Sequence, residues 1–555
     1  MDDAFLRAIR ADPEADLPRL VYADWLDEHD DPARAEFVRV QCELAKLPDH
    51  DAAYAALEDR EHELLAEHEA KWLGDGPTPD EWTFRRGFVD ELRLDPAAPP
   101  SGEWLTRQAV TSVTLAPRAL AVTAEAVLSV PGLEGLQELD VSPASRVWLM
   151  DDLYDLFHAW DTPGNKSLLI AGMSGLSQLG RHLRNAPLSR SLGRLNAGGL
   201  ARVPADHPDH IHAASLFGTL WQSPLESLTA YDSNLTSLAP LLNAGFAGSL
   251  SSLDVSHNPL AADAYREFVA ADPKLKLKHL DVSGTALCGP TLSNLLASRC
   301  CETLTGLAVN NAEPYLSDLV GTPFWGQAVD LSLHRCGVRD ASFQRLARST
   351  GPPALRSLDL GDNSLGVDGV RWLCEAAWAR PITWLNLAAS SLDFHSVRLM
   401  SQPGALPHLR TLHLGYNAFE NSGVVDHQVD DDALVALIRC PTLTRLRVLT
   451  LTANPVSDYG VELLMNAPHF TLSGLGLSHT QVTAGGVRRL AKSPRLSRLN
   501  WLDLSDNAAL RSDALLPLAE SPYLSPLCDL DISRTGASAF VRDLLRQRLG
   551  RRLLD

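Results

Sequence analysis

The sequence predicts an α/β solenoid of short parallel strands and intervening helices, preceded by a small all-α module. Three observations lead to this fold class. A leucine-rich motif recurs about every 27 residues from residue 225 onward, helical periodicity fills the spacers between motifs, and residues 1–75 form a separate acidic segment. Each repeat can bury its apolar face only against its neighbours, so we expect the copies to fold as one stack.

The repeated unit has the pattern L-x-x-L-x-L-x-x-N-x-L. Residues 355–365 meet every position of the pattern, and residues 409–419 and 446–456 match almost as well. The twelve units begin at Leu225, Leu250, Leu277, Leu304, Ala328, Leu355, Ile382, Leu409, Leu446, Leu472, Leu499 and Leu527. This pattern is identified as a leucine-rich repeat, and the room for a full helix in each unit resembles the ribonuclease-inhibitor type. The resemblance implies a horseshoe with parallel strands on the concave side and helices on the convex side.

Each position of the unit has a predicted role. The fourth and sixth positions, such as Leu358 and Leu360, point into the core, and the ninth position supplies an asparagine ladder that bonds the turn backbone of neighbouring units. The ladder asparagines are Asn258, Asn363, Asn417, Asn454 and Asn507, and smaller polar residues replace them as Thr285, Cys336, Ser390, Thr480 and Thr535. We therefore interpret Cys336 as a ladder substitute rather than a nucleophile.

The spacers and the flanking regions complete the predicted organisation. Helices are expected over residues 263–271, 340–349, 369–379, 458–466, 485–492 and 513–520. Before residue 225 the repeats are irregular, with strands expected in residues 88–94, 110–115, 136–141, 166–176 and 192–200, for about sixteen or seventeen strands in all. The predicted domains are a helical module at 1–82, the solenoid at 83–538 and a C-terminal capping helix at 539–555, which is basic and amphipathic.

The N-terminal module is acidic and helical, with 21 acids and 8 bases in residues 1–75. Helical periodicity covers residues 2–10, 17–28, 32–47 and 52–73, and Pro32 suits the start of a helix. Residues 16–44, together with the later stretch 84–94, resemble a bacterial repeat-companion domain known mainly from planctomycetes, for which no activity is implied. The residues that match its motif are Arg19, Tyr22, Asp24, Trp25 and Glu36. They are interpreted as fold-defining, with a docking surface as the alternative.

Composition narrows the class of partner and the compartment. The net charge of −20 argues against nucleic acid, because phosphate binding requires basic surfaces. No signal-like segment or long apolar run is present, which predicts no membrane partner. Eight scattered cysteines without C-x-x-C pairs fit reduced thiols, and a cytoplasmic location is expected.

Motifs for catalysis or for a cofactor are incomplete, so neither is predicted. No phosphate-binding G-x-x-x-x-G-K-[ST] loop occurs, Leu176 breaks a nucleophile elbow at residues 172–176, and Ala66 stands where a zinc-binding helix starting at His62 needs its second histidine.

Two polar segments leave alternatives open. His207, His210 and His212 form either a transition-metal loop or a solvated loop. The 37-residue step from Leu409 to Leu446 contains Asp426, His427, Asp430, Asp431 and Asp432. These residues could bind calcium, whereas the simpler interpretation is that Asp431 and Asp432 cap the helix that begins at Ala433.

The candidate binding residues lie on the predicted concave face. They are the aromatic residues Trp384, Trp501, Tyr231 and Tyr416, the aspartates Asp254, Asp281, Asp359, Asp503 and Asp531, and His413. Large aromatics on a rigid surface are typical interaction hot spots. Aspartate at the fifth position is also common in this repeat, so the acidic column is either a feature of the scaffold or a tuned binding surface.

The predicted function is a non-catalytic interaction scaffold that binds a protein, preferably a basic one, on the concave face. The alternative is an acidic inhibitor or regulator of a basic enzyme, similar to ribonuclease-inhibitor-like or GTPase-activating repeat proteins. A ubiquitin-ligase-like effector is the remote alternative, since such an effector needs a catalytic domain after the repeats. No metal and no cofactor are predicted, and the sequence leaves the oligomeric state open.

Overall fold

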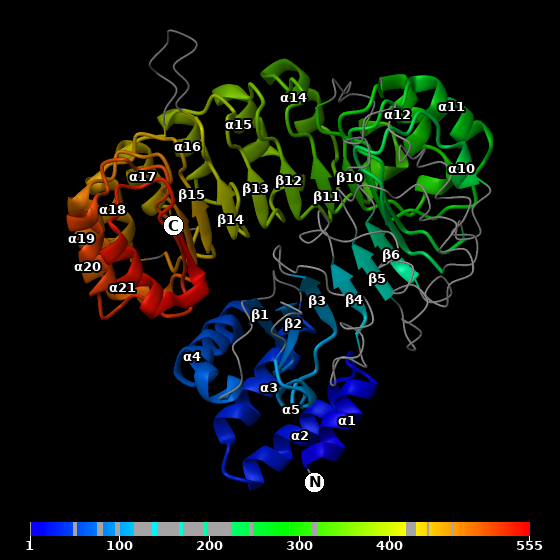
Figure 1. The fold of residues 1–555 in the computed structure, drawn as a ribbon. Coiled ribbons are helices and arrows are strands. Elements are labelled where there is room, and N and C mark those ends of the chain that lie inside the picture. Colours follow the sequence, from blue (N-terminus) through cyan, green and yellow to red (C-terminus); the bar gives the residue numbers. More distant parts are fainter. Residues whose placement is uncertain are drawn as a thin grey trace, which may run out of the picture. The chain divides into compact units, whose positions relative to one another are not determined.

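The computed structural model describes most of the chain, shown in Figure 1. The described residues are 2–47, 53–74, 81–94, 100–115, 136–140, 166–169, 192–196, 224–242, 248–287, 289–311, 319–417, 429–440, 443–468 and 470–555. The chain forms two compact units. Unit 1 comprises residues 1–286 and 298–303, and unit 2 comprises residues 287–297 and 304–555.

Unit 1 begins with the four predicted helices, which are confirmed. They are α1 (Asp2–Ala11), α2 (Asp16–Glu28), α3 (Pro32–Leu44) and α4 (Tyr54–Leu73). The Asp31 side chain caps α3 by accepting a hydrogen bond from the Arg34 amide at 3.4 Å, and Pro32 occupies the first turn, where its missing N–H is not needed. Leu6, Ile9, Ala23 and Val38 bury their side chains against Phe88, so the helices share a core with the strand that follows them.

The strands of unit 1 start with a hairpin that the repeat pattern of the sequence does not predict. Strand β1 (Glu81–Arg85) pairs antiparallel with β2 (Phe88–Leu94). Gly87 in the hairpin turn has a φ of +92°, and any side chain there would collide with Val38 of α3. A glycine is therefore required for the hairpin to approach the helix.

From β2 onward, neighbouring strands of unit 1 pair in parallel and in chain order. After the short helix α5 (Gly102–Thr106) come β3 (Ser112–Leu115), β4 (Glu138–Asp140), β5 (Lys166–Leu169), β6 (Leu192–Asn196), β7 (Ser227–Thr229), β8 (Ser252–Asp254) and β9 (His279–Asp281). Helices α10 (Ala239–Leu242) and α11 (Ala262–Ala270) and the 3₁₀ turn η6 (Arg299–Cys301) connect the later strands. The predicted strands within residues 88–94, 110–115, 136–141, 166–176 and 192–200 are thus confirmed.

Unit 2 repeats a strand and a helix. Its strands are β10 (Gly306–Ala308), β11 (Asp330–Ser332), β12 (Ser357–Asp359), β13 (Trp384–Asn386), β14 (Thr411–His413), β15 (Val448–Thr450), β16 (Gly474–Gly476), β17 (Trp501–Asp503), β18 (Asp529–Asp531) and β19 (Leu553–Leu554). Its helices are α12 (Gly289–Leu296), α14 (Asp340–Ala347), α15 (Gly366–Glu375), α16 (Phe394–Met400), α17 (Asp431–Ile438), α18 (Asp458–Asn466), α19 (Ala484–Lys492), α20 (Ser512–Ala519) and α21 (Ala539–Leu549). The strands pair in parallel, and the helices cover one face of their sheet (Figure 1).

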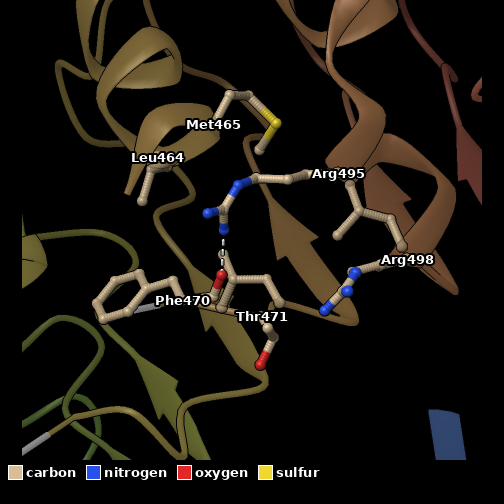
Figure 2. Close-up of a pocket in the computed structure, with 8 residues that line it drawn as sticks. Leu464, Met465, Phe470, Thr471, Arg495 and Arg498 are labelled. Carbon is tan, nitrogen blue, oxygen red and sulfur yellow. Dashed lines mark hydrogen bonds between the residues drawn. The ribbon is translucent and has the colours of Figure 1, made fainter. Parts of the chain in front are cut away.

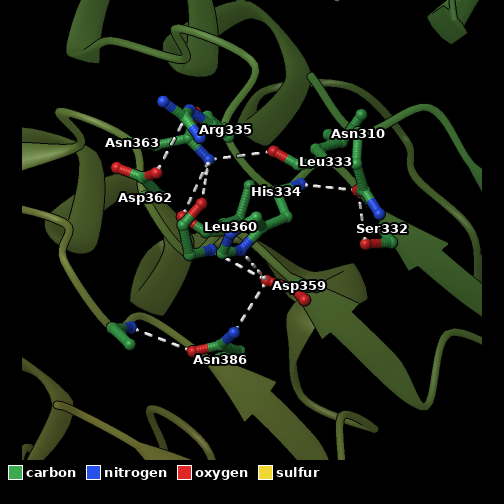
Figure 3. Close-up of polar contacts among 12 residues, drawn as sticks. Asn310, Ser332, Leu333, His334, Arg335, Asp359, Leu360, Asp362, Asn363 and Asn386 are labelled. Atoms are coloured by element: carbon green, nitrogen blue, oxygen red, sulfur yellow. Dashed lines mark hydrogen bonds and ion pairs between the residues drawn. The ribbon is translucent and has the colours of Figure 1, made fainter. Parts of the chain in front are cut away.

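The predicted roles of the repeat positions are confirmed. Leu358 and Leu360 are fully buried, as are their equivalents in neighbouring units. Asn363 shows the ladder most completely. Its Nδ2 donates to the carbonyls of Leu333, Leu360 and Gly361 at 2.8–3.0 Å (Figure 3). Its Oδ1 accepts from the amides of Cys336 and Val338 at 3.0 and 2.9 Å. In successive repeats, the residue before the ladder position has a positive φ, and this turns the chain out of the strand.

Cys336 acts as the predicted ladder substitute. It is 4% exposed, and its thiol donates to the carbonyl of Val309 at 3.1 Å. Ser390 occupies the same position one unit after Asn363 and donates to the carbonyl of Leu360 at 3.0 Å. A buried thiol engaged with a backbone carbonyl is suited to structure rather than to nucleophilic attack.

Two local expectations differ from the structure. Asp430, and not Asp431 or Asp432, caps α17, because the Asp430 carboxylate accepts from the Ala433 amide at 3.0 Å. The Asp431 carboxylate instead accepts from the Ser457 amide at 3.0 Å and so links α17 to the start of α18. At the C-terminus, α21 confirms the expected helix, but the last residues also add β19, which pairs in parallel with β18.

Candidate functional site

The candidate site in unit 2 is the face of the sheet that its helices leave open. We define the open face of unit 2 as the first and third residues of strands β10 to β18, which are the third and fifth positions of each repeat. The middle residue of each of these strands is buried. Successive side chains of a strand point to opposite faces of the sheet. The first and third side chains of each strand therefore lie on the face away from the leucine core.

Trp384 and His413 form a contact pair on this open face. The two residues lie on adjacent strands, and their ring centroids are 5.2 Å apart with an interplanar angle of 58°. The His413 Nδ1 is 2.9 Å from the Thr450 hydroxyl on the next strand. Burial lowers the pKa of His413, while the charge of Asp359 opposes this shift. The imidazole is therefore held in place from both sides and presents the half-buried Trp384 in a fixed orientation.

Trp501 lies across the neighbouring strand rather than standing clear of it. Strand β16 carries glycines at both of its outward positions, Gly474 and Gly476, and both are buried. A Cβ atom added to either glycine would lie 3.1–3.3 Å from the Trp501 ring. The indole thus uses the space that these glycines leave, and Trp501 remains half-buried.

The aspartate column has a structural role that the sequence left undecided. Each aspartate at the fifth position accepts a hydrogen bond from the amide two residues later, at 2.8–2.9 Å in Asp254, Asp281, Asp359, Asp503 and Asp531. Such turns hold the backbone as it leaves the strand. One oxygen of every carboxylate is therefore already engaged by the fold.

Asp359 is the best connected member of the column. It accepts from the Asn386 amide group at 2.9 Å and lies 3.6 Å from the Nδ1 of His334 (Figure 3). Asn386 in turn accepts from the Ala388 amide at 3.0 Å, so it repeats the aspartate turn in the next unit. The cluster fixes a polar region beside Trp384 rather than leaving mobile carboxylates.

The remaining predicted site residues are divided between the two units. Tyr416 in unit 2 follows β14, has a φ of 55° and is 51% exposed. Tyr231, Asp254 and Asp281 belong to unit 1, where burial raises the pKa of Asp281 against hydrogen bonds from Ser283. The site residues Trp384, His413, Trp501, Asp359, Asp503 and Asp531 all belong to unit 2.

The open face of unit 2 is acidic. Its outward positions include Asp330, Asp359, Asp503, Asp529 and Asp531, and none of the outward positions in β10 to β18 is lysine or arginine. Arg552 lies 3.5 Å from Asp529 and neutralises one of these charges. The remaining carboxylates give this surface a negative potential.

A small pocket between α18 and the following strand belongs to the scaffold. It has a volume of about 10 Å³, which leaves room for no more than a water molecule. The Arg495 guanidinium donates to the backbone carbonyl of Phe470 across it (Figure 2). This arginine closes the backbone of the turn and leaves no room for a substrate.

The sequence offers candidate metal ligands in two segments, residues 207–212 and 426–432. Within the part of the chain that the structure describes, no group of three or more His, Cys, Asp or Glu side chains is arranged to hold a metal ion. Residues 207–212, Asp426 and His427 lie outside the described residues. Asp430 and Asp431 are engaged by Ala433 and Ser457, as described above.

The motif residues of the N-terminal module divide into core and surface positions. Arg19 and Tyr22 are buried, and the Arg19 guanidinium donates to the carbonyl of Pro13 at 2.8 Å. Trp25 stacks on Tyr22 at 5.7 Å. At the surface, Asp24 pairs with Arg39 at 2.7 Å, and Glu36 pairs with Arg60 through two hydrogen bonds of 2.7 and 2.8 Å. These contacts fit a fold-defining role, and the resemblance to a repeat-companion domain stays a prediction.

The repeat pattern, the ladder and the parallel strand-helix units agree with a family match. A family model described as Leucine Rich repeat matches residues 353–374 and 405–437. The chain therefore contains leucine-rich repeats. Ribonuclease inhibitor from Sus scrofa is 26% identical to this chain over an alignment of 303 residues that covers 47% of this chain and 65% of the inhibitor. The match therefore spans somewhat less than two thirds of that relative.

Two solved leucine-rich-repeat-like chains align at low similarity. An internalin from Listeria monocytogenes is 18% identical, with 61% of this chain and 81% of the internalin covered and a TM-score of 0.35. A chain of the TLR13–ssRNA13 complex is 16% identical, with 80% of this chain and 59% of that chain covered and a TM-score of 0.38. With TM-scores this low, neither alignment carries an argument about ligands. Among the described residues, no helix has the length and apolar composition to span a bilayer.

Proposed function

We propose that this leucine-rich-repeat protein is a non-catalytic binding module that recognises a protein partner through the open face of unit 2. The observation that carries the proposal is the pair Trp384 and His413, with the imidazole held between the indole ring at 5.2 Å and the Thr450 hydroxyl at 2.9 Å. Tryptophan is among the residues most enriched in interaction hot spots. The proposal includes no metal, cofactor or catalytic residue.

A rigid surface explains how such a site would gain affinity. Trp384 and Trp501 lie on β13 and β17, four strand spacings apart, which corresponds to roughly 19 Å at about 4.8 Å per strand. Both rings are already packed against neighbouring residues, so little side-chain freedom would be lost on binding. The two indoles would act as fixed anchors, and the acidic positions around them would orient a partner.

The charge of the face favours a basic partner. Opposite charges across an interface accelerate association and select among partners, and their effect weakens as salt screens them. The relative that supports this idea is the ribonuclease inhibitor, which matches over 303 residues. We therefore keep an acidic inhibitor or regulator of a basic enzyme as a second candidate function. The cytoplasmic location also remains part of this proposal.

The test compares variants of the full chain in quantitative affinity capture. Trp384→Ala should weaken retention of a specific partner about thirtyfold, because removal of a hot-spot tryptophan costs roughly 2 kcal/mol. Tyr459→Ala is the matched control, since Tyr459 is a 53% exposed aromatic residue on α18, away from the open face. Equal retention of the partner by the Trp384 variant and by the intact chain would reject the proposed site.

The second candidate function is tested with the captured partner. An enzyme that is inhibited, with an affinity that falls steeply between low and high salt, would support the inhibitor. A partner that is bound tightly at any salt concentration and keeps its full activity would support the scaffold instead.

A further inference from the structure

The N-terminal module contains a pocket that the proposed function does not use. It has a volume of about 640 Å³, within the usual range for small-molecule sites. Leu6 and Leu26 line it together with the aromatic residues Tyr22, Trp72, Phe88 and Trp104. The pocket lies wholly within unit 1, between the helices and the first strands of the repeats.

Arg34 gives this pocket a buried positive charge beside its aromatic residues. The residue lines the pocket and is 8% exposed. Its guanidinium lies 4.8 Å from the centre of the Trp72 ring and 5.4–5.6 Å from the rings of Phe37, Phe84 and Phe88. Burial lowers the pKa of Arg34 to about 10, while Tyr22 and Asp31 oppose the shift, so the side chain remains a cation at neutral pH.

The charges around the pocket do not balance. Lys71 pairs with Asp31 at 3.0 Å, and Arg107 pairs with Glu103 at 2.6 Å. These four residues and Arg34 are the charged residues that line the pocket. Arg34 is therefore the one charged residue of this lining that is not in one of these ion pairs. Aromatic rings stabilise the faces of a guanidinium, but they do not satisfy the N–H groups at its edge.

Two buried hydrogen-bond donors of the lining also lack acceptors. Among the described residues, the Nη1 of Arg34 and the Nε1 of Trp72 are buried and have no hydrogen-bond partner. Gln108 is 4% exposed, and its Oε1 accepts from the Val89 amide at 3.3 Å. Its Nε2 adds an amide donor to the lining. Buried donors without acceptors are costly, so an acceptor is the missing component of this pocket.

We infer that the pocket binds a small carboxylate carried on an aromatic body. The carboxylate would accept hydrogen bonds from Arg34, Trp72 and Gln108, and the aromatic body would fill the space between Trp104, Tyr22 and Phe88. Arginine is well suited to this role because its planar N–H groups match the two oxygens of a carboxylate. The same chemistry is offered by a free aromatic acid and by the C-terminus of a peptide that ends in an aromatic residue.

The first test compares an acid with its neutral analogue on the full chain. The probes are 3-phenylpropionate and 3-phenylpropanamide, titrated at neutral pH and followed by saturation-transfer difference NMR. The acid should bind saturably and at least tenfold more tightly than the amide. Equal affinity of the two probes, or no saturable binding of the acid, would overturn the inference. If the acid does not bind saturably, we would assign the donors of Arg34, Trp72 and Gln108 to acceptors within the chain instead of to a ligand.

Variants place the binding in the pocket. Trp72→Phe keeps an aromatic ring but removes the N–H, and it should weaken binding of the acid about fivefold or more. Arg34→Gln should abolish the preference for the acid over the amide. The matched control is Arg39→Gln on the same helix, which removes an exposed arginine paired with Asp24 and Asp27 and should leave binding unchanged.

The Trp72 variant keeps the inference testable if the Arg34 variant does not fold. Unchanged affinity of the acid for Trp72→Phe would contradict the assignment. The two sources of the carboxylate are separated with the tripeptide acetyl-Gly-Gly-Phe, carrying a free or an amidated C-terminus. Tighter binding of the free peptide than of 3-phenylpropionate would identify a chain terminus, and the reverse order would identify a small acid.

Discussion

Replacing Asn363 by alanine should destabilise unit 2 by about 3 kcal/mol. The truncation removes the acceptor for the amides of Cys336 and Val338 and the donor to the carbonyl of Leu333. The other two carbonyls that Asn363 bonds have further donors, because Gly361 accepts from the Arg335 amide and Leu360 accepts from the Ser390 hydroxyl. Three buried groups at roughly 1 kcal/mol each or more give the expected loss.

The assay is urea unfolding followed by far-ultraviolet circular dichroism. The matched control is Asn466→Ala, because Asn466 is an exposed asparagine at the end of α18 and should change stability by less than about 0.5 kcal/mol. Asn363→Ser should lie between the two, since a serine can still donate to a carbonyl in the way that Ser390 does. A loss for Asn363→Ala no larger than that of the control would refute the ladder as the source of this stability.

Three further predictions concern single contacts in unit 2. Gly476→Val should destabilise the unit because the new side chain meets Trp501, whereas Gly326→Ala, with open space around it, should be neutral in urea unfolding. His413 has a lowered pKa, so the unfolded chain takes up its proton first as pH falls below about 6.5. The unfolding free energy should then decrease, and His413→Gln should show a smaller decrease between pH 7.5 and 5.5. Asp430→Ala should cost about 1 kcal/mol as a lost helix cap, and Asp432→Ala should cost clearly less in the same assay.

The repeat could be predicted in detail because its roles are local and periodic. Leu358 and Asn363 have positions fixed by the same short pattern in every unit, and Cys336 could be assigned to the ladder from its position alone. Strand β1 and strand β19 were missed because neither belongs to a repeat. Each forms only by pairing with a strand of the array.

The details of the candidate site depend on contacts between neighbouring repeats within unit 2. Trp501 and Asp503 were both found on the predicted face, but the fit of Trp501 over Gly474 and Gly476 requires the register of two adjacent strands. The two glycines at outward positions of one strand were a visible signal of such a fit. The division of the predicted residues between two compact units could not be read from a regular period.

The pocket of the N-terminal module was missed for a similar reason. Arg34 stands in line with Phe37, Val38 and Gln41 on the buried side of α3, a spacing that places an arginine in an apolar stripe. That pattern could have been recognised. Its partners Trp72 and Phe88, however, come from later elements, and only the folded chain brings them to the guanidinium.

Site-specific photo-crosslinking tests the central claim most directly, because it reports which face of unit 2 a partner touches. A benzophenone amino acid at Thr411, on the open face between Trp384 and Val448, should crosslink to a partner protein, whereas the same group at Tyr459 on α18 should not. Crosslinking at Thr411 that disappears in the Trp384→Ala background is the predicted result. Crosslinking of the partner at Tyr459 with none at Thr411 would contradict recognition through the open face.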